Sequence, residues 1–127
     1  MIRTFALLYG IVFLVVAVLG LATHGMSAHQ GELLGIFPIN GLHNLVHLLI
    51  GLGGVMAYFG GEGAARLYAR IVGIAYMLVA VLGLVSPSGF GLIPIGGPDV
   101  ALHFVAAAAA LYFGFAAPAR QLAPAAR

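Results

Sequence analysis

Four ionisable side chains in this sequence have the chemistry and the spacing of metal ligands. His43 and His47 are separated by one helical turn, and so are Asp99 and His103. Residues at this spacing lie on one face of an α-helix, so each pair is expected to project in one direction. Three imidazoles and a carboxylate can ligate zinc, iron, manganese or copper. His43, His47, Asp99 and His103 are therefore the candidate metal ligands.

A haem or a quinone is an alternative occupant of the same cluster. Haem requires axial ligands on opposite faces of the porphyrin. His47 and His103 can supply them if their helices face one another, whereas His43 and His47 lie on one face of one helix. His47 and His103 are therefore the expected cofactor-binding residues.

The same residues also have purely structural interpretations. Asp99 follows Gly97 and Pro98, so it can cap the first turn of a helix and complement the helix dipole. Asn40 suits the N-cap of the preceding helix, which would leave His43 in a wet first turn near the interface. His47 and His103 can instead share a hydrogen bond between helices. These interpretations compete with ligand binding.

Other polar residues give weaker indications of chemistry. His24, His29 and Glu32 share a polar stretch and could bind a metal ion from outside or respond to pH, but solvated loop histidines usually do neither. The sequence contains no phosphate loop, zinc-protease pair or dinucleotide fingerprint. Three serines have no convincing base and acid partners for nucleophilic catalysis: Ser27, Ser86 and Ser88. We therefore expect a protein without catalytic activity.

The composition places these residues in an integral membrane protein. Hydrophobic residues make up 63% of the chain and charged residues 6%, whereas a soluble domain has about 45–50% and about 25%. So few charges could not cover the surface of a soluble fold. The arginines are too dispersed for a nucleic-acid surface, so no nucleic-acid partner is expected. The absence of cysteine excludes thiolate metal sites and disulfides.

Four apolar segments are each long enough to span a bilayer as a helix. A span needs about 20 mainly apolar residues, and unpaired backbone amides are too costly in lipid for other structures. The predicted helices are residues 5–22, 42–59, 67–85 and 100–117. The predicted fold is an all-α four-helix bundle in a single domain, residues 1–127, with residues 118–127 as a cytoplasmic tail.

The arginines predict the orientation in the membrane, because short cytoplasmic loops carry the excess of basic residues. All of them fall on one side of the predicted bundle: Arg3, Arg66, Arg70, Arg120 and Arg127. The loops on the other side contain none. Both termini are therefore expected in the cytoplasm, and the expected compartment is the bacterial plasma membrane.

The chain resembles two tandem helical hairpins, at residues 3–61 and 66–117. "RTFALLYGIVFLVVAVLGL" from Arg3 aligns without a gap with "RLYARIVGIAYMLVAVLGL" from Arg66. The second halves align more weakly, with His47 opposite His103 and His43 opposite Asp99. Units that cross twice have the same orientation, so a pseudo-two-fold axis along the membrane normal is expected. The repeat also argues that the first segment is retained rather than cleaved as a secretory signal.

Small residues recur at helical spacing and permit close contact between helices. Examples are Ala6 with Gly10, Ala69 with Gly73, and Gly53 with Ala57. These faces can pack within one chain, or they can form a homo-oligomer or dock on a larger membrane complex. The sequence leaves both possibilities open.

The stretch "LLGIFPINGLHNLVHLLIGL", from Leu33 to Leu52, resembles a bacterial family of small four-span membrane proteins known as domain of unknown function 4383. Its distinctive part runs from Asn40 to His47. The resemblance extends over all four predicted helices. It implies a four-helix inner-membrane protein and no established activity or cofactor.

The sequence is compatible with two main functions. The leading expectation is a non-enzymatic membrane subunit or structural protein, and the alternative is a metal-, haem- or quinone-binding protein. A channel or transporter is a weaker possibility, because four short helices with few polar residues leave little room for a pore.

Overall fold

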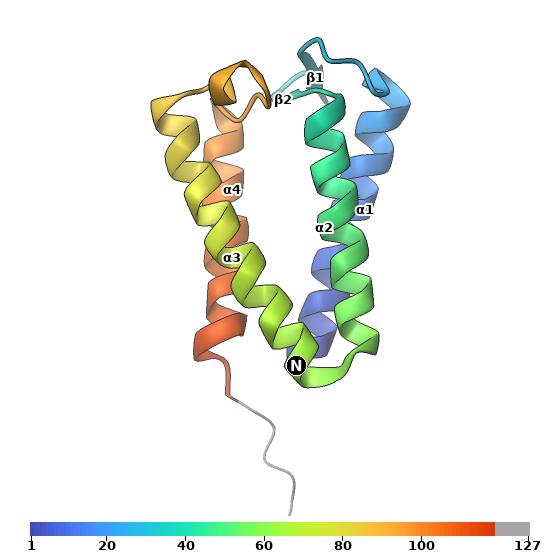
Figure 1. Cartoon of the computed structure of the whole chain (residues 1–127), viewed down its shortest axis with the longest axis vertical. Helices are drawn as coiled ribbons and strands as arrows, with labels where there is room; N and C mark the ends of the chain where they lie inside the picture. Colours follow the sequence, from blue (N-terminus) through green and yellow to red (C-terminus); the bar gives the residue numbers. More distant parts are fainter. Residues whose placement is uncertain (119–127) are drawn as a thin grey trace, which may run out of the picture.

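The structure is a computed structural model that describes residues 1–118, and four long helices dominate this part of the chain (Figure 1). They are α1 (Ile2–His24), α2 (Gly41–Phe59), α3 (Gly61–Val85) and α4 (Pro98–Leu111), which continues as a π-helical turn (Tyr112–Ala116). All four are long and apolar enough to cross a membrane. Helix α1 packs mainly on α2, and α3 mainly on α4. The prediction of four long apolar helices is confirmed.

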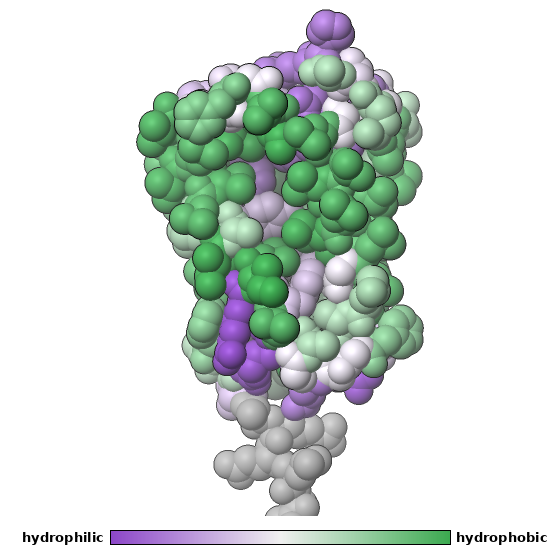
Figure 2. Space-filling view, viewed as in Figure 1, coloured by the Kyte–Doolittle hydropathy of each residue, from purple (hydrophilic) through white to green (hydrophobic). Residues whose placement is uncertain are grey.

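Much of the interior consists of small and polar residues, and many of the large apolar side chains face outward. Ala6, Ala69 and Ala107 are completely buried, whereas Leu8, Leu49 and Leu78 are well exposed. Figure 2 shows apolar side chains over most of the visible face, on both sides of a central hollow. Water would disfavour the exposure of so many leucines, whereas a lipid bilayer would solvate them. The small residues allow close contact between the helices.

Glycines permit the closest contacts within each pair of helices. A Cβ atom on Gly10 would lie 2.7 Å from the backbone oxygen of Gly51 and 3.0 Å from the Val55 nitrogen. A Cβ atom on Gly73 would lie 2.9 Å from the Leu111 nitrogen. Since real Cβ atoms do not come so close, both helix pairs depend on glycine at these positions.

The N-terminus, the α2–α3 turn and the end of α4 lie at one end of the bundle, which we call the terminal end (Figure 1). The chain reverses at Gly61, whose φ of 91° suits glycine. Helix α3 therefore starts there rather than at Leu67, the predicted start. Residues 119–127 of the predicted tail, with Arg120 and Arg127, lie outside the described residues.

The described arginines satisfy backbone oxygens at the ends of neighbouring helices. Arg3 donates to the Tyr58 oxygen of α2 at 2.9 Å, and Arg70 donates to the Gly114 oxygen of α4 at 2.9 Å. Arg66 donates to the Ala117 oxygen at 3.1 Å. The last carbonyl groups of a helix have no partner within the helix, so these bonds pair groups that would otherwise be unpaired.

The opposite end, which we call the loop end, consists of residues 25–40 and 86–97. It contains an antiparallel pair of short strands, β1 (Gly31–Leu33) and β2 (Phe37–Ile39), and a 3-10 turn (Gly89–Gly91). The strands are a difference from the all-α prediction. Pro38 lies in β2, and proline is a poor indicator of a strand in a sequence.

Candidate metal-binding site

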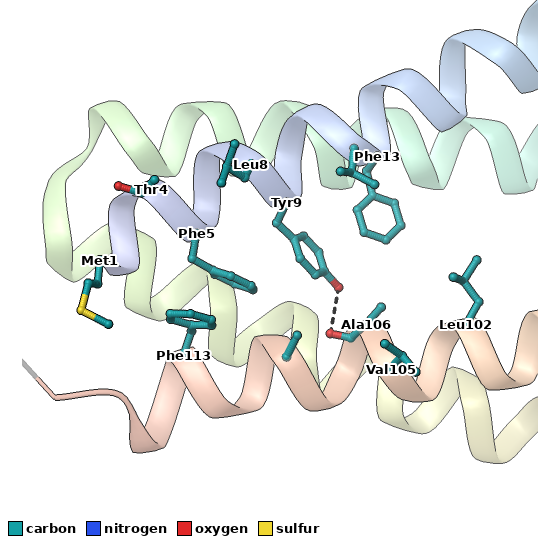
Figure 3. Close-up of a pocket in the computed structure, with 12 residues that line it drawn as sticks. Met1, Thr4, Phe5, Leu8, Tyr9, Phe13, Leu102, Val105, Ala106 and Phe113 are labelled. Carbon is teal, nitrogen blue, oxygen red and sulfur yellow. Dashed lines mark hydrogen bonds between the residues drawn. The ribbon is translucent and has the colours of Figure 1, made fainter.

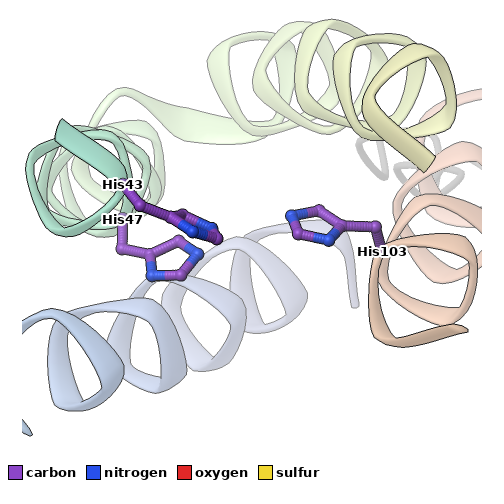
Figure 4. Close-up of side chains that lie close together, drawn as sticks. All are labelled: His43, His47 and His103. Carbon is purple, nitrogen blue, oxygen red and sulfur yellow. The ribbon is translucent and has the colours of Figure 1, made fainter. Parts of the chain in front are cut away.

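Three buried histidines from two helices converge near the loop end of the bundle. His43 and His47 project from α2, and His103 projects toward them from α4 (Figure 4). Each offers one ring nitrogen to a group whose members all lie within 4.8 Å of one another. The three residues are 3–5% exposed. The tertiary structure therefore brings together the histidines that the sequence singled out.

Asp99 lies beside two of these histidines. One of its carboxylate oxygens, Oδ2, is 3.2 Å from His103 Nδ1 and 3.9 Å from His43 Nε2. His103 Nδ1 is also 2.8 Å from the backbone oxygen of Asp99. An Nδ1–H group that donates there leaves His103 Nε2 free as an acceptor or ligand. Asp99 can thus orient His103 while contributing a negative charge to the cluster.

Two aromatic rings pack against the histidines. Phe13 of α1 and Tyr76 of α3 stack on one another with ring centroids 5.2 Å apart. The Phe13 ring lies 5.4 Å from the His47 ring, and the Tyr76 ring lies 4.9 Å from the His103 ring. All four helices therefore contribute side chains to this region. Nothing in the sequence distinguished these two aromatics from lipid-facing ones.

Several polar atoms in the cluster are buried without a hydrogen-bond partner among residues 1–118. They are His43 Nδ1, His47 Nδ1, Asp99 Oδ2 and the hydroxyl oxygen of Tyr76. A buried polar group without a partner costs about 1–3 kcal/mol, so such groups are rare and indicate an ion, a water molecule or a functional site. Their concentration around three histidines makes this the candidate functional site.

The structural interpretations of these residues have mixed outcomes. Asn40 is the N-cap of α2, because its Oδ1 accepts a hydrogen bond from the His43 backbone nitrogen at 2.9 Å. The expectation of a wet His43 is wrong, since the loop end covers it and leaves it 3% exposed. The Asp99 side chain makes no capping hydrogen bond, although it does lie in the first turn of α4.

The second group of polar residues does not form a site of this kind. His29 and Glu32 are exposed, and His24 is partly exposed. Within the described part of the chain, the three converging histidines are the only group of metal-ligand side chains at suitable distances.

One protein family matches the chain over nearly its whole length. The family described as domain of unknown function (DUF4383) matches residues 3–116. The chain belongs to the DUF4383 family. Comparison with curated proteins and with solved structures returns no match. The resemblance noted from the Leu33–Leu52 stretch is confirmed, and family membership carries no activity with it.

This DUF4383 protein has two apolar cavities near the cluster. One, of about 270 Å³, reaches His43, Tyr76 and His103 and extends under the α3–α4 loop. The other is a wider groove of about 710 Å³ between α1 and α4, lined by residues such as Phe5, Tyr9 and Leu102 (Figure 3). Tyr9 donates a hydrogen bond across this groove to the Ala106 backbone oxygen at 3.3 Å.

Proposed function

We propose that this protein is a multi-pass membrane protein that binds one transition-metal ion through His43, His47 and His103. The convergence of three buried imidazoles from α2 and α4 carries the proposal. Nitrogen ligands of one tetrahedral zinc ion lie about 3.3 Å apart. Small rotations of the side chains would bring nitrogens within 4.8 Å of one another to that separation.

The chemistry of the donor set favours a divalent ion such as zinc, copper, iron or nickel. Imidazole is a good ligand for all of them, and no thiolate is present to bias the choice. A buried carboxylate is costly unless a cation or hydrogen-bond donors compensate it. Asp99 is 2% exposed, so a bound dication would stabilise its negative charge. Coordination to such an ion would also give a ring nitrogen of His43 and one of His47 a partner.

An ion fits the surroundings of the cluster better than a haem does. A porphyrin between His47 and His103 would have to enter the space that the Phe13–Tyr76 stack and His43 fill. The His43 and His47 ring centroids are only 4.4 Å apart, and the His43 and His103 centroids are 5.9 Å apart. Haem binding would therefore require the helix pairs to separate, whereas ion binding requires only side-chain movement.

The proposed location is the bacterial plasma membrane, with both termini in the cytoplasm. Arg3, Arg66 and Arg70 all lie at the terminal end, which supports a cytoplasmic position for that end. The loop end, with the histidine cluster beneath it, would then face the outside. A metal ion would reach the cluster from that side.

Equivalent contacts support the proposal that the two hairpins form tandem, symmetry-related units. Gly20 of α1 approaches Ile39 and Asn44, and Gly83 of α3 approaches Ile95 and Val100. These contacts occupy matching positions in the aligned repeats. The Phe13–His47 and Tyr76–His103 contacts also correspond. A pseudo-two-fold axis would pass between the two halves, close to the cluster.

A non-enzymatic role as a membrane subunit or structural protein is a second candidate. The apolar groove between α1 and α4 favours it, because Phe5 and Phe113 stack inside the bundle at 4.3 Å while Leu8 and Val105 remain exposed at the rim. Cross-linking in membranes should then capture a defined oligomer or partner at this groove. A protein that stays strictly monomeric under these conditions would contradict this candidate.

Metal analysis of purified protein tests the main proposal. Protein in lipid nanodiscs should retain about one transition-metal ion per chain after dialysis, measured by mass spectrometry of the elements. His47→Gln and His103→Gln should lose the ion, because each removes one of three ligands. His24→Gln and His29→Gln should retain it and serve as matched controls.

Two outcomes would contradict the metal proposal. One is a well-folded protein that contains no ion and gains none from added zinc. The other is an ion that remains in the His47→Gln and His103→Gln variants. A Soret absorbance band in the purified protein would instead favour haem.

A further inference from the structure

The groove between α1 and α4 occupies one half of the bundle along its length. Its lining begins at Met1 and reaches Phe13 on α1. At about 1.5 Å per residue, the helix rises about 18 Å between these two residues. The hydrocarbon core of a bilayer is about 30 Å thick, so each leaflet contributes about 15 Å. The groove therefore starts at the terminal end and is about as long as the acyl chains of one leaflet.

Phe13 and Leu102 lie at the inner end of the groove (Figure 3). The Phe13 ring centroid is 5.2 Å from that of Tyr76 and 5.4 Å from that of His47, so the groove ends where the histidine cluster begins. A transmembrane helix of a partner protein would extend along the whole core of about 30 Å. The shorter groove suits a lipid chain better than a partner helix.

The two walls of the groove carry side chains of different size. Helix α1 contributes aromatic rings at successive turns, among them Phe5 and Tyr9, whose centroids lie 5.1 Å apart. Helix α4 contributes the small side chains of Ala106 and Ala109. The Phe5 ring also stacks on Phe113 of α4 at 4.3 Å, which links the two walls. The small alanine side chains leave the volume between the walls unfilled.

The chemistry of the lining favours a hydrocarbon occupant. Among the described residues that line the groove, Thr4 and Tyr9 carry hydroxyl groups. The Tyr9 hydroxyl group already donates to the Ala106 backbone oxygen, and Thr4 is exposed at the terminal end (Figure 3). A polar ligand group deep in the groove would lose its hydrogen bonds to water without gaining a side-chain partner, which is costly. An alkyl chain needs no such partner.

The outer end of the groove is basic. Arg66 Nη1 lies 3.5 Å from the backbone oxygen of Phe113, which lines the groove. Within residues 1–118 the Arg66 guanidinium donates hydrogen bonds from Nη1 alone, so its other N–H groups can bind a phosphate. Arg3 and Arg70 lie at the same end, where Glu62 is the only acidic residue in the described part of the chain. This charge attracts anionic lipid headgroups.

We infer that the groove between α1 and α4 holds one acyl chain of an anionic phospholipid from the leaflet on the terminal side, with the lipid phosphate bound by Arg66. The second chain of the lipid remains in the bilayer. The inference rests on the proposed membrane location but not on the metal site, because none of the residues of the histidine cluster lines the groove. It also differs from the second candidate function, in which a protein occupies the groove.

Titration with phosphatidylglycerol tests the inference. Delipidated protein in detergent micelles should bind one molecule of palmitoyl-oleoyl phosphatidylglycerol more tightly than any further one, measured by native mass spectrometry. Phosphatidylcholine with the same chains should bind about fivefold more weakly, as expected for the loss of one arginine attraction. Arg66→Gln should remove this preference. Arg70→Gln should keep it, because the Arg70 guanidinium lies over Phe115, outside the groove lining. An unchanged preference in Arg66→Gln would overturn the assigned phosphate contact.

Filling the groove provides an independent test. Ala109→Phe should abolish the tight binding of phosphatidylglycerol, whereas Ala108→Phe, at an exposed position outside the lining, should leave it unchanged. If Ala109→Phe does not fold, the smaller change Ala106→Leu should still weaken binding. The inference is overturned if folded wild-type protein binds no lipid more tightly than the rest. It is also overturned if Ala109→Phe or Ala106→Leu binds phosphatidylglycerol as tightly as Ala108→Phe.

Single cysteines distinguish a lipid from a second copy of the chain. The sequence contains no cysteine, so Val105→Cys at the rim of the groove introduces the only thiol. Val81→Cys, on an exposed face of α3, measures random collisions between chains. With lipid in the groove, both variants should form disulfide-linked dimers equally slowly when they are oxidised in membranes. A dimer that forms rapidly with Val105→Cys alone would place a second copy at the groove and overturn the inference.

Two further observations separate this inference from the proposed function. His47→Gln should lose the metal ion and still bind phosphatidylglycerol tightly, whereas Ala109→Phe should lose the lipid and keep the ion. A protein that alkaline carbonate washes from membranes would contradict the membrane location itself. A protein that stays in carbonate-washed membranes but binds no lipid tightly contradicts this inference alone.

Discussion

His43 Nε2 lies 3.9 Å from Asp99 Oδ2, although the two residues begin different helices in different halves of the chain. Both side chains are nearly inaccessible to solvent. The same Asp99 oxygen also lies 3.2 Å from His103 Nδ1. The carboxylate therefore lies beside one histidine of each helix pair. A charge in this position affects both the assembly of the bundle and anything bound by the histidines.

Replacing the Asp99 carboxylate with an amide should weaken metal binding while the bundle stays folded. Asp99→Asn keeps the shape of the side chain but removes its negative charge. Loss of such an orienting partner typically reduces metal affinity about 10–100-fold. Competition with a zinc chelator would measure the change. Unchanged affinity, with folding intact, would mean that Asp99 does not act on the bound ion.

Metal binding should raise the stability of the protein. Zinc at about 100 times its dissociation constant should stabilise the folded state by about 2.7 kcal/mol, provided that the unfolded chain does not bind it. Thermal unfolding in detergent, with and without zinc, would measure the effect. The His103→Gln variant should show little of this stabilisation. A zinc response of equal size in that variant would contradict binding at the cluster.

Asn40→Ala should destabilise the loop end by about 1–3 kcal/mol. The substitution removes both the N-cap hydrogen bond to His43 and the hydrogen bond to Leu92. Asn40→Ser is the matched control, because the serine hydroxyl can accept the cap hydrogen bond but is too short to replace the donor to Leu92. Its free energy of unfolding should lie between those of wild type and Asn40→Ala. If both variants are as stable as wild type, neither bond contributes.

Gly10→Ala and Gly73→Ala should each destabilise one helix pair by about 1–3 kcal/mol, as expected for overpacking. The added Cβ atom would lie within 3.0 Å of the facing backbone in both cases. Gly63→Ala is the control, since nothing lies within 4 Å of its Cβ position. This change should be neutral or stabilise α3 by up to about 1 kcal/mol. Equal effects at all three positions in unfolding experiments would argue against close packing at Gly10 and Gly73.

Reporter fusions should place the two ends of the bundle on opposite sides of the membrane. Alkaline phosphatase should be active when it is inserted after Ser88 in the α3–α4 loop, and inactive when it is fused to the C-terminus. Green fluorescent protein at the C-terminus should be fluorescent. The reverse pattern would mean that the arginine-bearing terminal end faces outward.

The limits of sequence-based prediction are clear at particular residues. The N-cap function of Asn40 depends on the adjacent residues and was predictable, whereas its bond to Leu92 joins segments far apart in the chain. The burial of His43 was missed because covering by a loop is not a local property. Phe13 and Tyr76 were missed because an aromatic residue in an apolar segment has the same sequence pattern whether it faces lipid or a histidine.

The four apolar helices, the arginines at one end and the spacing of His43 with His47 and of Asp99 with His103 are all visible along the chain. They depend on hydropathy and helical periodicity, which are local properties. The folded arrangement adds that α2 and α4 present their histidines to one another, that Asp99 lies beside His43 and His103, and that a cavity opens beside Tyr76. These relationships depend on how small residues allow the two helix pairs to approach, which is a property of contacts between distant segments.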